Sequence, residues 1–138
     1  MKTLLIHCDN FSYITTQRTK VAENLPNGCK SCAFKDTLVV FVTADKVDEK
    51  NPQKVIVLGS KEIVNISNKG GVKNIIIFPF VLHSDKICSV NIGLDIIEGL
   101  YEKFSLFNYK VDKPFFGWEK LFSMTSKDHI LAELSRTI

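Results

Sequence analysis

The chain has 138 residues, of which 45% are hydrophobic and 24% charged, and this balance suits one globular domain with one core. Its net charge of +3 is small for a protein that grips a nucleic-acid duplex, but it is compatible with holding a few nucleotides of RNA. No apolar run approaches the roughly 20 residues of a membrane helix, and polar residues interrupt the first apolar run too early for a signal peptide. We therefore expect a soluble, cytoplasmic protein with a single domain over residues 1–138 that needs no membrane.

The first half of the chain predicts three strands separated by polar segments. Apolar, aromatic and β-branched residues gather in three runs, and the turn-formers Asp9 and Asn10 stand between the first two. The polar stretch before the third run contains proline and glycine, which is typical of a surface excursion. The predicted elements are strands over 3–8, 11–16 and 37–44, with the excursion over 18–35.

The second half predicts two helices and further strands. Asn51 can cap a helix, Pro52 suits the first helical position, and a pair of glycines ends the helical pattern. Ser89 or Asn91 can cap a second helix, whose apolar residues recur at helical spacing as far as Phe104. The predicted strands are 74–80, 109–111 and 115–125, and the pattern over 129–135 leaves strand and helix open.

The order of these elements indicates the fold class. A strand, a helix and a second strand between residues 37 and 80 form a crossover that implies a parallel, right-handed strand pair. We therefore predict an α/β (α+β) protein. A fold class of this kind does not by itself give a function.

The cysteines provide a weak metal or redox signal. Cys8 and Cys88 lie beside apolar runs and are expected to be small core residues. Cys29 and Cys32 form a C-x-x-C, but a zinc site would need two further ligands at suitable spacing, and a redox motif should begin a helix. We expect no metal, and favour a local disulfide or two free thiols over a zinc or redox module.

Candidate catalytic side chains lie mainly near predicted strand ends, and no standard motif such as G-x-S-x-G or H-E-x-x-H accompanies them. Each has a structural interpretation. His7 is a hydrogen-bonded histidine, His83 caps a turn, Lys120 packs its stem with its ammonium in water, and Glu133 pairs with Arg136. Physical reasoning from these residues stops at an α/β domain.

Four blocks of sequence carry a resemblance that goes further. They are MKTLLIHCD at 1–9, KVDEKNP at 46–52, FGWEKLF at 116–122 and LAELSR at 131–136. In order and spacing they resemble the amino-terminal editing domains of archaeal-type threonyl-tRNA synthetases, over essentially the whole chain. The resemblance implies a D-aminoacyl-tRNA deacylase-like fold, with β-sheet layers and two main helices, and a homodimer.

The resemblance also implies an activity, the hydrolysis of L-serine from the 3′-terminal adenosine of threonine tRNA. Serine lacks one methyl of threonine, worth only about 1–3 kcal/mol in a pocket, so a second, hydrolytic site must remove the error. No cofactor is expected for this reaction, since ATP and zinc belong to a synthetase catalytic domain that is absent here. The expected partners are the acceptor end of tRNA(Thr) and the catalytic and anticodon-binding domains, in cis or in trans.

Site residues follow from the same resemblance. Lys120 would stabilise charge and position the water, Glu133 would orient the substrate amine or ribose, and His83 would be the third catalytic residue. Because such domains enlist the terminal ribose 2′-hydroxyl, no protein base is required. The substrate-binding residues would be Ala44, Pro79, Phe80, Val81, Gly117, Glu119 and His7.

Departures from the family pattern leave two alternatives open. His83 stands one place later than the family's histidine, and Glu119 replaces an aromatic residue, where its carboxylate is expected to bind Lys120. These changes favour a weakened or inactive domain that binds the tRNA acceptor end or supports dimerisation. Fold analogy alone supports the second alternative, a D-aminoacyl-tRNA deacylase.

Overall fold

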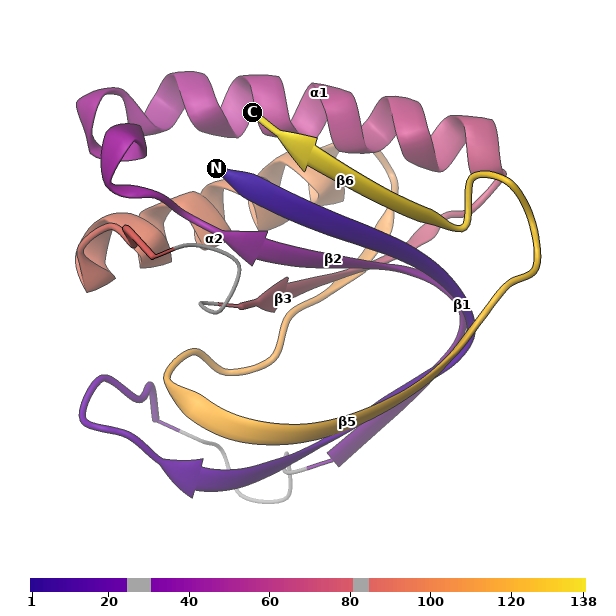
Figure 1. The fold of residues 1–138 in the computed structure, drawn as a ribbon, viewed down its shortest axis with the longest axis horizontal. Coiled ribbons are helices and arrows are strands. Elements are labelled where there is room, and N and C mark those ends of the chain that lie inside the picture. Colours follow the sequence, from indigo (N-terminus) through magenta and orange to yellow (C-terminus); the bar gives the residue numbers. More distant parts are fainter. Residues whose placement is uncertain (25–30, 81–84) are drawn as a thin grey trace.

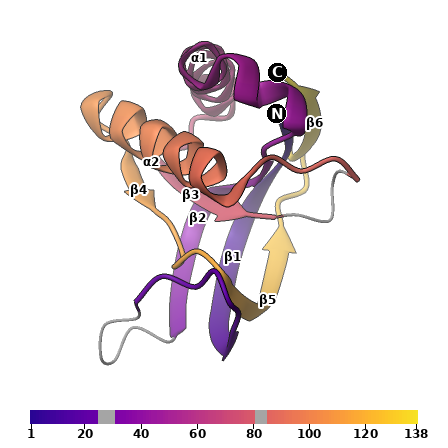
Figure 2. The ribbon, with the colours of Figure 1, turned by 90° about the vertical axis from the view of Figure 1, so that its left-hand side faces the viewer.

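A computed structural model of the chain describes residues 1–24, 31–80 and 85–138, and contains a curled six-stranded sheet. The strand order is β4-β3-β2-β1-β5, and β6 pairs with the other half of β1. Two long helices cover one face of the sheet, while β5 closes the curl on the other side (Figures 1 and 2). The elements are β1 (Lys2–Arg18), β2 (Ser31–Thr43), the 3₁₀ helix η1 (Lys46–Lys50), α1 (Pro52–Gly70), β3 (Asn74–Pro79), α2 (Val90–Leu106), β4 (Lys110–Asp112), β5 (Trp118–Ser126) and β6 (Glu133–Thr137).

The predicted turn after the first strand is wrong, because β1 runs unbroken through it. Asp9 is instead an extra residue between the pairs that Cys8 and Asn10 form with β5, which is the pattern of a β-bulge. On the facing strand, Asp36 has a positive φ of 45°. Aspartate tolerates both the bulge position and the positive φ. β1 and β2 therefore bend together at Asp9 and Asp36, and the sheet curls over itself.

The ends of three other predicted elements also change. Residues 31–35, placed in a surface excursion by their polarity, belong to β2 because they pair with the far half of β1. β5 begins at Trp118, after a turn, and the open element near the end is a strand, β6. In each case pairing with β1 decides the structure, which local polarity could not predict.

The predicted crossover is confirmed. β2 and β3 are parallel and joined by α1, and β3 and β4 are parallel and joined by α2. The Asn51 side chain accepts a hydrogen bond from the Lys54 backbone N–H at 3.1 Å, and Gly71 ends α1 at a φ of 67°. Ser89 occupies the cap position of α2, although its side chain makes no capping hydrogen bond.

Two apolar cores lie on opposite faces of the sheet. Aliphatic residues, such as Leu5, Val40 and Ile77, pack against the helices. The second core lies inside the curl and is aromatic, with Phe11 and Phe78 among its buried residues. Within the described residues, no helix is long and apolar enough to cross a membrane.

Candidate functional site

The aromatic core reaches the mouth of the curl, where Phe78 of β3 meets Phe122 of β5. Their ring centroids are 5.4 Å apart, and Phe41 packs against both. Phe41 and Phe78 are buried, whereas 41% of the Phe122 surface is exposed. The aromatic cluster therefore reaches the protein surface at Phe122. Aromatic rings bury a large apolar area and shape a low-dielectric wall at this end of the sheet.

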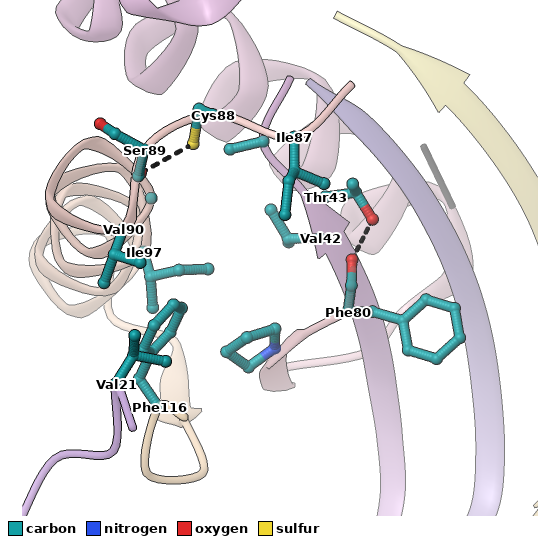
Figure 3. A pocket seen from close by; sticks show the side chains of 13 residues that line it. Val21, Val42, Thr43, Phe80, Ile87, Cys88, Ser89, Val90, Ile97 and Phe116 are labelled. Atoms are coloured by element: carbon teal, nitrogen blue, oxygen red, sulfur yellow. Dashed lines mark hydrogen bonds between the residues drawn. The ribbon is translucent and has the colours of Figure 1, made fainter. Parts of the chain in front are cut away.

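Two adjoining cavities open at this rim. The first is an apolar recess of about 150 Å³ between the ends of β2 and β3 and the start of α2 (Figure 3). The second is a wider cavity of about 390 Å³ in front of β5. The wider cavity lies in the size range of small-molecule sites, and the recess is smaller. The two cavities adjoin each other, since they share four lining residues: Val21, Pro79, Phe80 and Phe116.

Lys120 supplies the ammonium group of the wider cavity. Its Nζ donates a hydrogen bond of 2.7 Å to the Trp118 carbonyl and lies 5.7 Å from the centre of the Phe78 ring. Burial lowers the pKa of Lys120 to about 8, and the carboxylate of Glu23 acts in the opposite direction. Within the described residues Lys120 forms no ion pair, so no carboxylate contacts its ammonium directly.

The turn at 116–118 forms the rim beside Lys120 and packs against the segment after β1. Gly117 has a φ of 79°, and a Cβ added there would lie 2.5 Å from the Cα of Ala22. Thr19 donates its backbone N–H and its hydroxyl to the Gly117 carbonyl. Only glycine allows both this conformation and this close backbone approach.

Several residues predicted for the site come together at these cavities. Pro79, Phe80, Gly117, Glu119 and Lys120 line the wider one. Ala44 lines the adjoining recess. Val81 and His83 lie outside the described residues.

The predicted contact between Glu119 and Lys120 is wrong. The structure contains no ion pair between these neighbouring side chains, and Glu119 is exposed. Successive side chains of a strand point to opposite faces, which keeps the two charged groups apart. The carboxylate whose charge acts on Lys120 is that of Glu23.

Glu133 and Lys120 lie on different strands, which pair with opposite halves of β1. Along β1, Glu133 is opposite Ile6, whereas Lys120 is opposite Thr15. Nine residues of strand correspond to about 30 Å of chain path. The predicted Glu133–Arg136 pair is also wrong, since Arg136 binds Glu62 at 3.1 Å.

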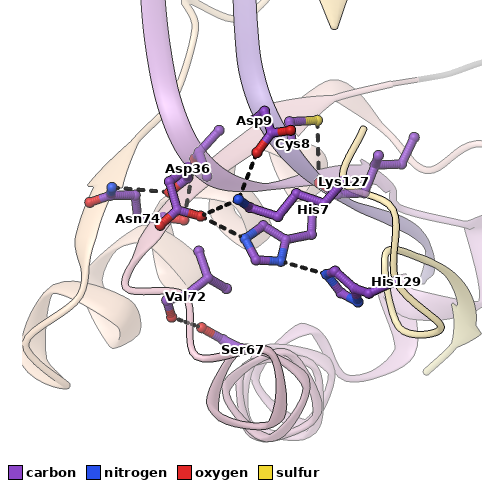
Figure 4. Close-up of polar contacts among 11 residues, drawn as sticks. His7, Cys8, Asp9, Asp36, Ser67, Val72, Asn74, Lys127 and His129 are labelled. Atoms are coloured by element: carbon purple, nitrogen blue, oxygen red, sulfur yellow. Dashed lines mark hydrogen bonds and ion pairs between the residues drawn. The ribbon is translucent and has the colours of Figure 1, made fainter. Parts of the chain in front are cut away.

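His7 is buried at the bend, away from both cavities (Figure 4). Its Nε2 lies 2.9 Å from an oxygen of Asp36, and its Nδ1 lies 3.0 Å from Nε2 of His129. Lys127 completes the group by binding Asp9 at 2.7 Å and Asp36 at 3.3 Å. These five residues, here called the bend cluster, join β1, β2 and the segment between β5 and β6. His7 is thus a hydrogen-bonded histidine on a strand, as its structural interpretation predicted.

The cysteines differ in their surroundings. Cys8 is fully buried as predicted, and its burial raises the pKa of its thiol to about 11. Cys88 is half-buried and lines the apolar recess, so its expected place in the core is wrong. Cys32 is a free thiol, whereas Cys29 lies outside the described residues. The residues that the structure describes contain no cluster that could hold a metal ion.

Sequence reasoning missed several contributors to the rim. Val21 and Phe116 line both cavities, Trp118 accepts the hydrogen bond of Lys120, and Glu23 carries the nearby charge. Val21 and Glu23 stand in a polar stretch with no motif, so their meeting with the 116–118 turn gives no local signal. The block at 116–122, with Lys120 and its aromatic residues, had already pointed to this region.

Comparison with solved structures confirms the predicted fold. The chain is similar to the c-Myc DNA unwinding element binding protein, with a TM-score of 0.71 over 100% of this chain and 99% of that one, at 11% sequence identity. At this identity the likeness concerns the fold alone. The curled sheet with two helices on one face is therefore a fold that the two proteins share.

Comparison of sequences defines the family. A family model for the archaea-specific editing domain of threonyl-tRNA synthetase matches residues 1–138, and this chain belongs to that family. Threonine–tRNA ligases of Methanosphaera stadtmanae and Pyrococcus horikoshii are 37% and 34% identical to it over its whole length. The chain spans only 22% of either relative. Its class of function is therefore aminoacyl-tRNA proofreading.

Proposed function

We propose that this domain hydrolyses the ester that joins L-serine to the 3′-terminal adenosine of tRNA(Thr). The observation that carries the proposal is the ammonium of Lys120, which is partly desolvated and faces a cavity without an ion-pair partner among the described residues. Attack of water on an ester develops negative charge on the carbonyl oxygen. A fixed cation in a low-dielectric site stabilises that charge more than water can.

The two cavities divide the substrate between them. The recess walled by Ala44, Pro79 and Phe80 receives the aminoacyl group, and the wider cavity receives the ester and the terminal ribose. Lys120 then stabilises the oxyanion and holds the attacking water, with help from the ribose 2′-hydroxyl. His83 is proposed as the third catalytic residue, and no metal or cofactor takes part.

Glu133 requires a second copy of the domain in this proposal. Its place on β6, distant from Lys120 along β1, keeps it from a substrate held by Lys120 of the same chain. In a homodimer, Glu133 of one copy would orient the amine or ribose bound by the other. The remaining partners are the tRNA(Thr) acceptor end and synthetase domains acting in cis or in trans.

Single-turnover hydrolysis of seryl- and threonyl-tRNA(Thr) tests the proposal, with Lys120→Met as the variant. We expect rapid release of serine only, and return to the spontaneous rate in the variant. Binding of the tRNA without release would contradict the proposal and identify an inactive acceptor-end domain. Faster hydrolysis of a D-aminoacyl ester than of L-serine would identify a D-aminoacyl-tRNA deacylase instead.

A further inference from the structure

Glu23, in the segment that follows β1, binds the turn at 116–118 through both backbone and side chain. Its carboxylate accepts the backbone N–H of Phe116 at 2.7 Å, and its own N–H donates to the Phe116 carbonyl at 3.0 Å. Its carbonyl accepts the indole N–H of Trp118 at 2.7 Å. The Trp118 carbonyl in turn accepts the hydrogen bond of Lys120. Glu23 is therefore linked to Lys120 through one residue.

The charge of Glu23 also acts on Lys120 directly. Burial favours the neutral amine of Lys120, and the negative charge of Glu23 opposes that effect. Two other charged groups lie nearby in the described structure. Glu119 is exposed, and the guanidinium of Arg18 lies 5.9 Å from the centre of the Trp118 ring. Among the carboxylates of the described residues, Glu23 is the one whose charge acts on the ammonium of Lys120.

We propose that Glu23 is a positioning residue of the editing site, whose carboxylate holds the 116–118 turn in place and whose negative charge favours the ammonium form of Lys120. This inference rests on the proposed function, because it assigns Glu23 to the oxyanion-stabilising group of that reaction. Glu23 does not touch the substrate. It acts through the turn that carries the Trp118 carbonyl and through its charge.

A direct titration of Lys120 tests the electrostatic part without any substrate. NMR of the domain with labelled lysine side chains follows Lys120 from pH 6 to 11, assigned by its loss in Lys120→Met. Glu23→Gln removes the charge but keeps an oxygen that can accept the Phe116 N–H. We expect it to lower the pKa of Lys120 by about half a pH unit or more. Glu62→Gln, remote on α1, is the matched control and should leave the titration unchanged. An unchanged titration in Glu23→Gln overturns the electrostatic part.

The single tryptophan of the chain reports on the turn. The indole N–H resonance of Trp118 should stay in place in Glu23→Gln and should shift or broaden in Glu23→Ala, which lacks the acceptor for the Phe116 N–H. Thermal unfolding of both variants shows whether the fold is retained. A Trp118 resonance that is unmoved in a folded Glu23→Ala protein overturns the positioning part.

A pH profile of single-turnover serine release connects both parts to catalysis. As pH rises through the pKa of Lys120, near 8 in the wild type, the ammonium is lost and release should slow. In Glu23→Gln this decline should begin at lower pH, so that release at pH 8.5 is reduced about two- to threefold while the rate at pH 6.5 is retained. An unshifted profile contradicts the inference although the proposed function stands. If the wild type releases no serine at any pH, the proposed function fails, and the lysine titration still decides how Glu23 acts on Lys120.

Discussion

Two lysines at opposite ends of β5 have opposite surroundings. Lys120, at the rim, is partly buried without an ion-pair partner in the described structure, and burial lowers its pKa to about 8. Lys127, just after the strand, binds the carboxylates of Asp9 and Asp36, and these hydrogen bonds raise its pKa. A lysine neutralised by carboxylates holds a structure together. A partly buried lysine without an ion-pair partner can direct its ammonium at the negative charge of a ligand.

The polar side chains of the bend cluster bind mainly one another. Both ring nitrogens of His7 have protein partners, and one nitrogen of His129 faces the backbone N–H of Leu131 at 3.2 Å. Its groups therefore compensate one another and join three segments where the sheet curls. The rim of the curl differs from the bend cluster. Hydrogen bonds fix the 116–118 turn there, but the ammonium of Lys120 has no ion-pair partner among the described residues.

The largest expected effect separates the two lysines by activity. Lys120→Met should slow single-turnover serine release by about 100-fold or more, as expected for loss of a group that stabilises an oxyanion. Lys127→Met, the matched substitution at the bend, should change the rate by less than about threefold, because an exposed ion pair contributes little. Equal losses in the two variants would remove the functional distinction between rim and bend.

The next effect concerns the backbone that shapes the rim. Gly117→Ala should lower the free energy of unfolding by about 2–4 kcal/mol, since the new Cβ meets backbone atoms at a positive φ. Gly71→Ala, also at a positive φ but with nothing within 4 Å of the new Cβ, should cost only about 1 kcal/mol. Urea unfolding measures both. If the two substitutions lowered the free energy of unfolding equally, the residues after β1 would have to move aside to make room for the new Cβ at position 117.

The smallest effect lies at the bend and depends on pH. Asp36 has its pKa lowered, first by the hydrogen bond from His7 and then by Lys127. Its contribution to stability is therefore present above its unfolded value near 3.8 and is lost as pH falls through the lower folded value. Asp36→Asn suits the positive φ and should cost less than about 1 kcal/mol at pH 7, because the carboxylate is largely exposed.

Urea unfolding from pH 7 down to pH 2.5 checks this sign. The difference between Asp36→Asn and the wild type should shrink below pH 4 and vanish at the acid end. Asp112→Asn, at the remote strand β4, serves as a comparison substitution. A difference that grows toward acid pH would contradict the assigned role of Asp36.

The sequence by itself determined the elements whose signals are local. Helix α1 follows from the Asn51 cap, Pro52 and the glycine end, and β3 follows from its continuous apolar run. The crossover between them follows from chain order. The family was also within reach of the sequence, because its blocks are contiguous segments that keep their order and spacing.

The tertiary structure alone decided the curl and the composition of the rim. Asp9 has the same local preference in a turn as in a bulge, and only pairing with β5 selects the bulge. Pairing of β1 with β5 brings Glu23 to the 116–118 turn, and β6, which carries Glu133, pairs with the other half of β1. These relations join residues that are distant in sequence, and their energies arise from strand pairing and desolvation, which no local pattern of residues encodes.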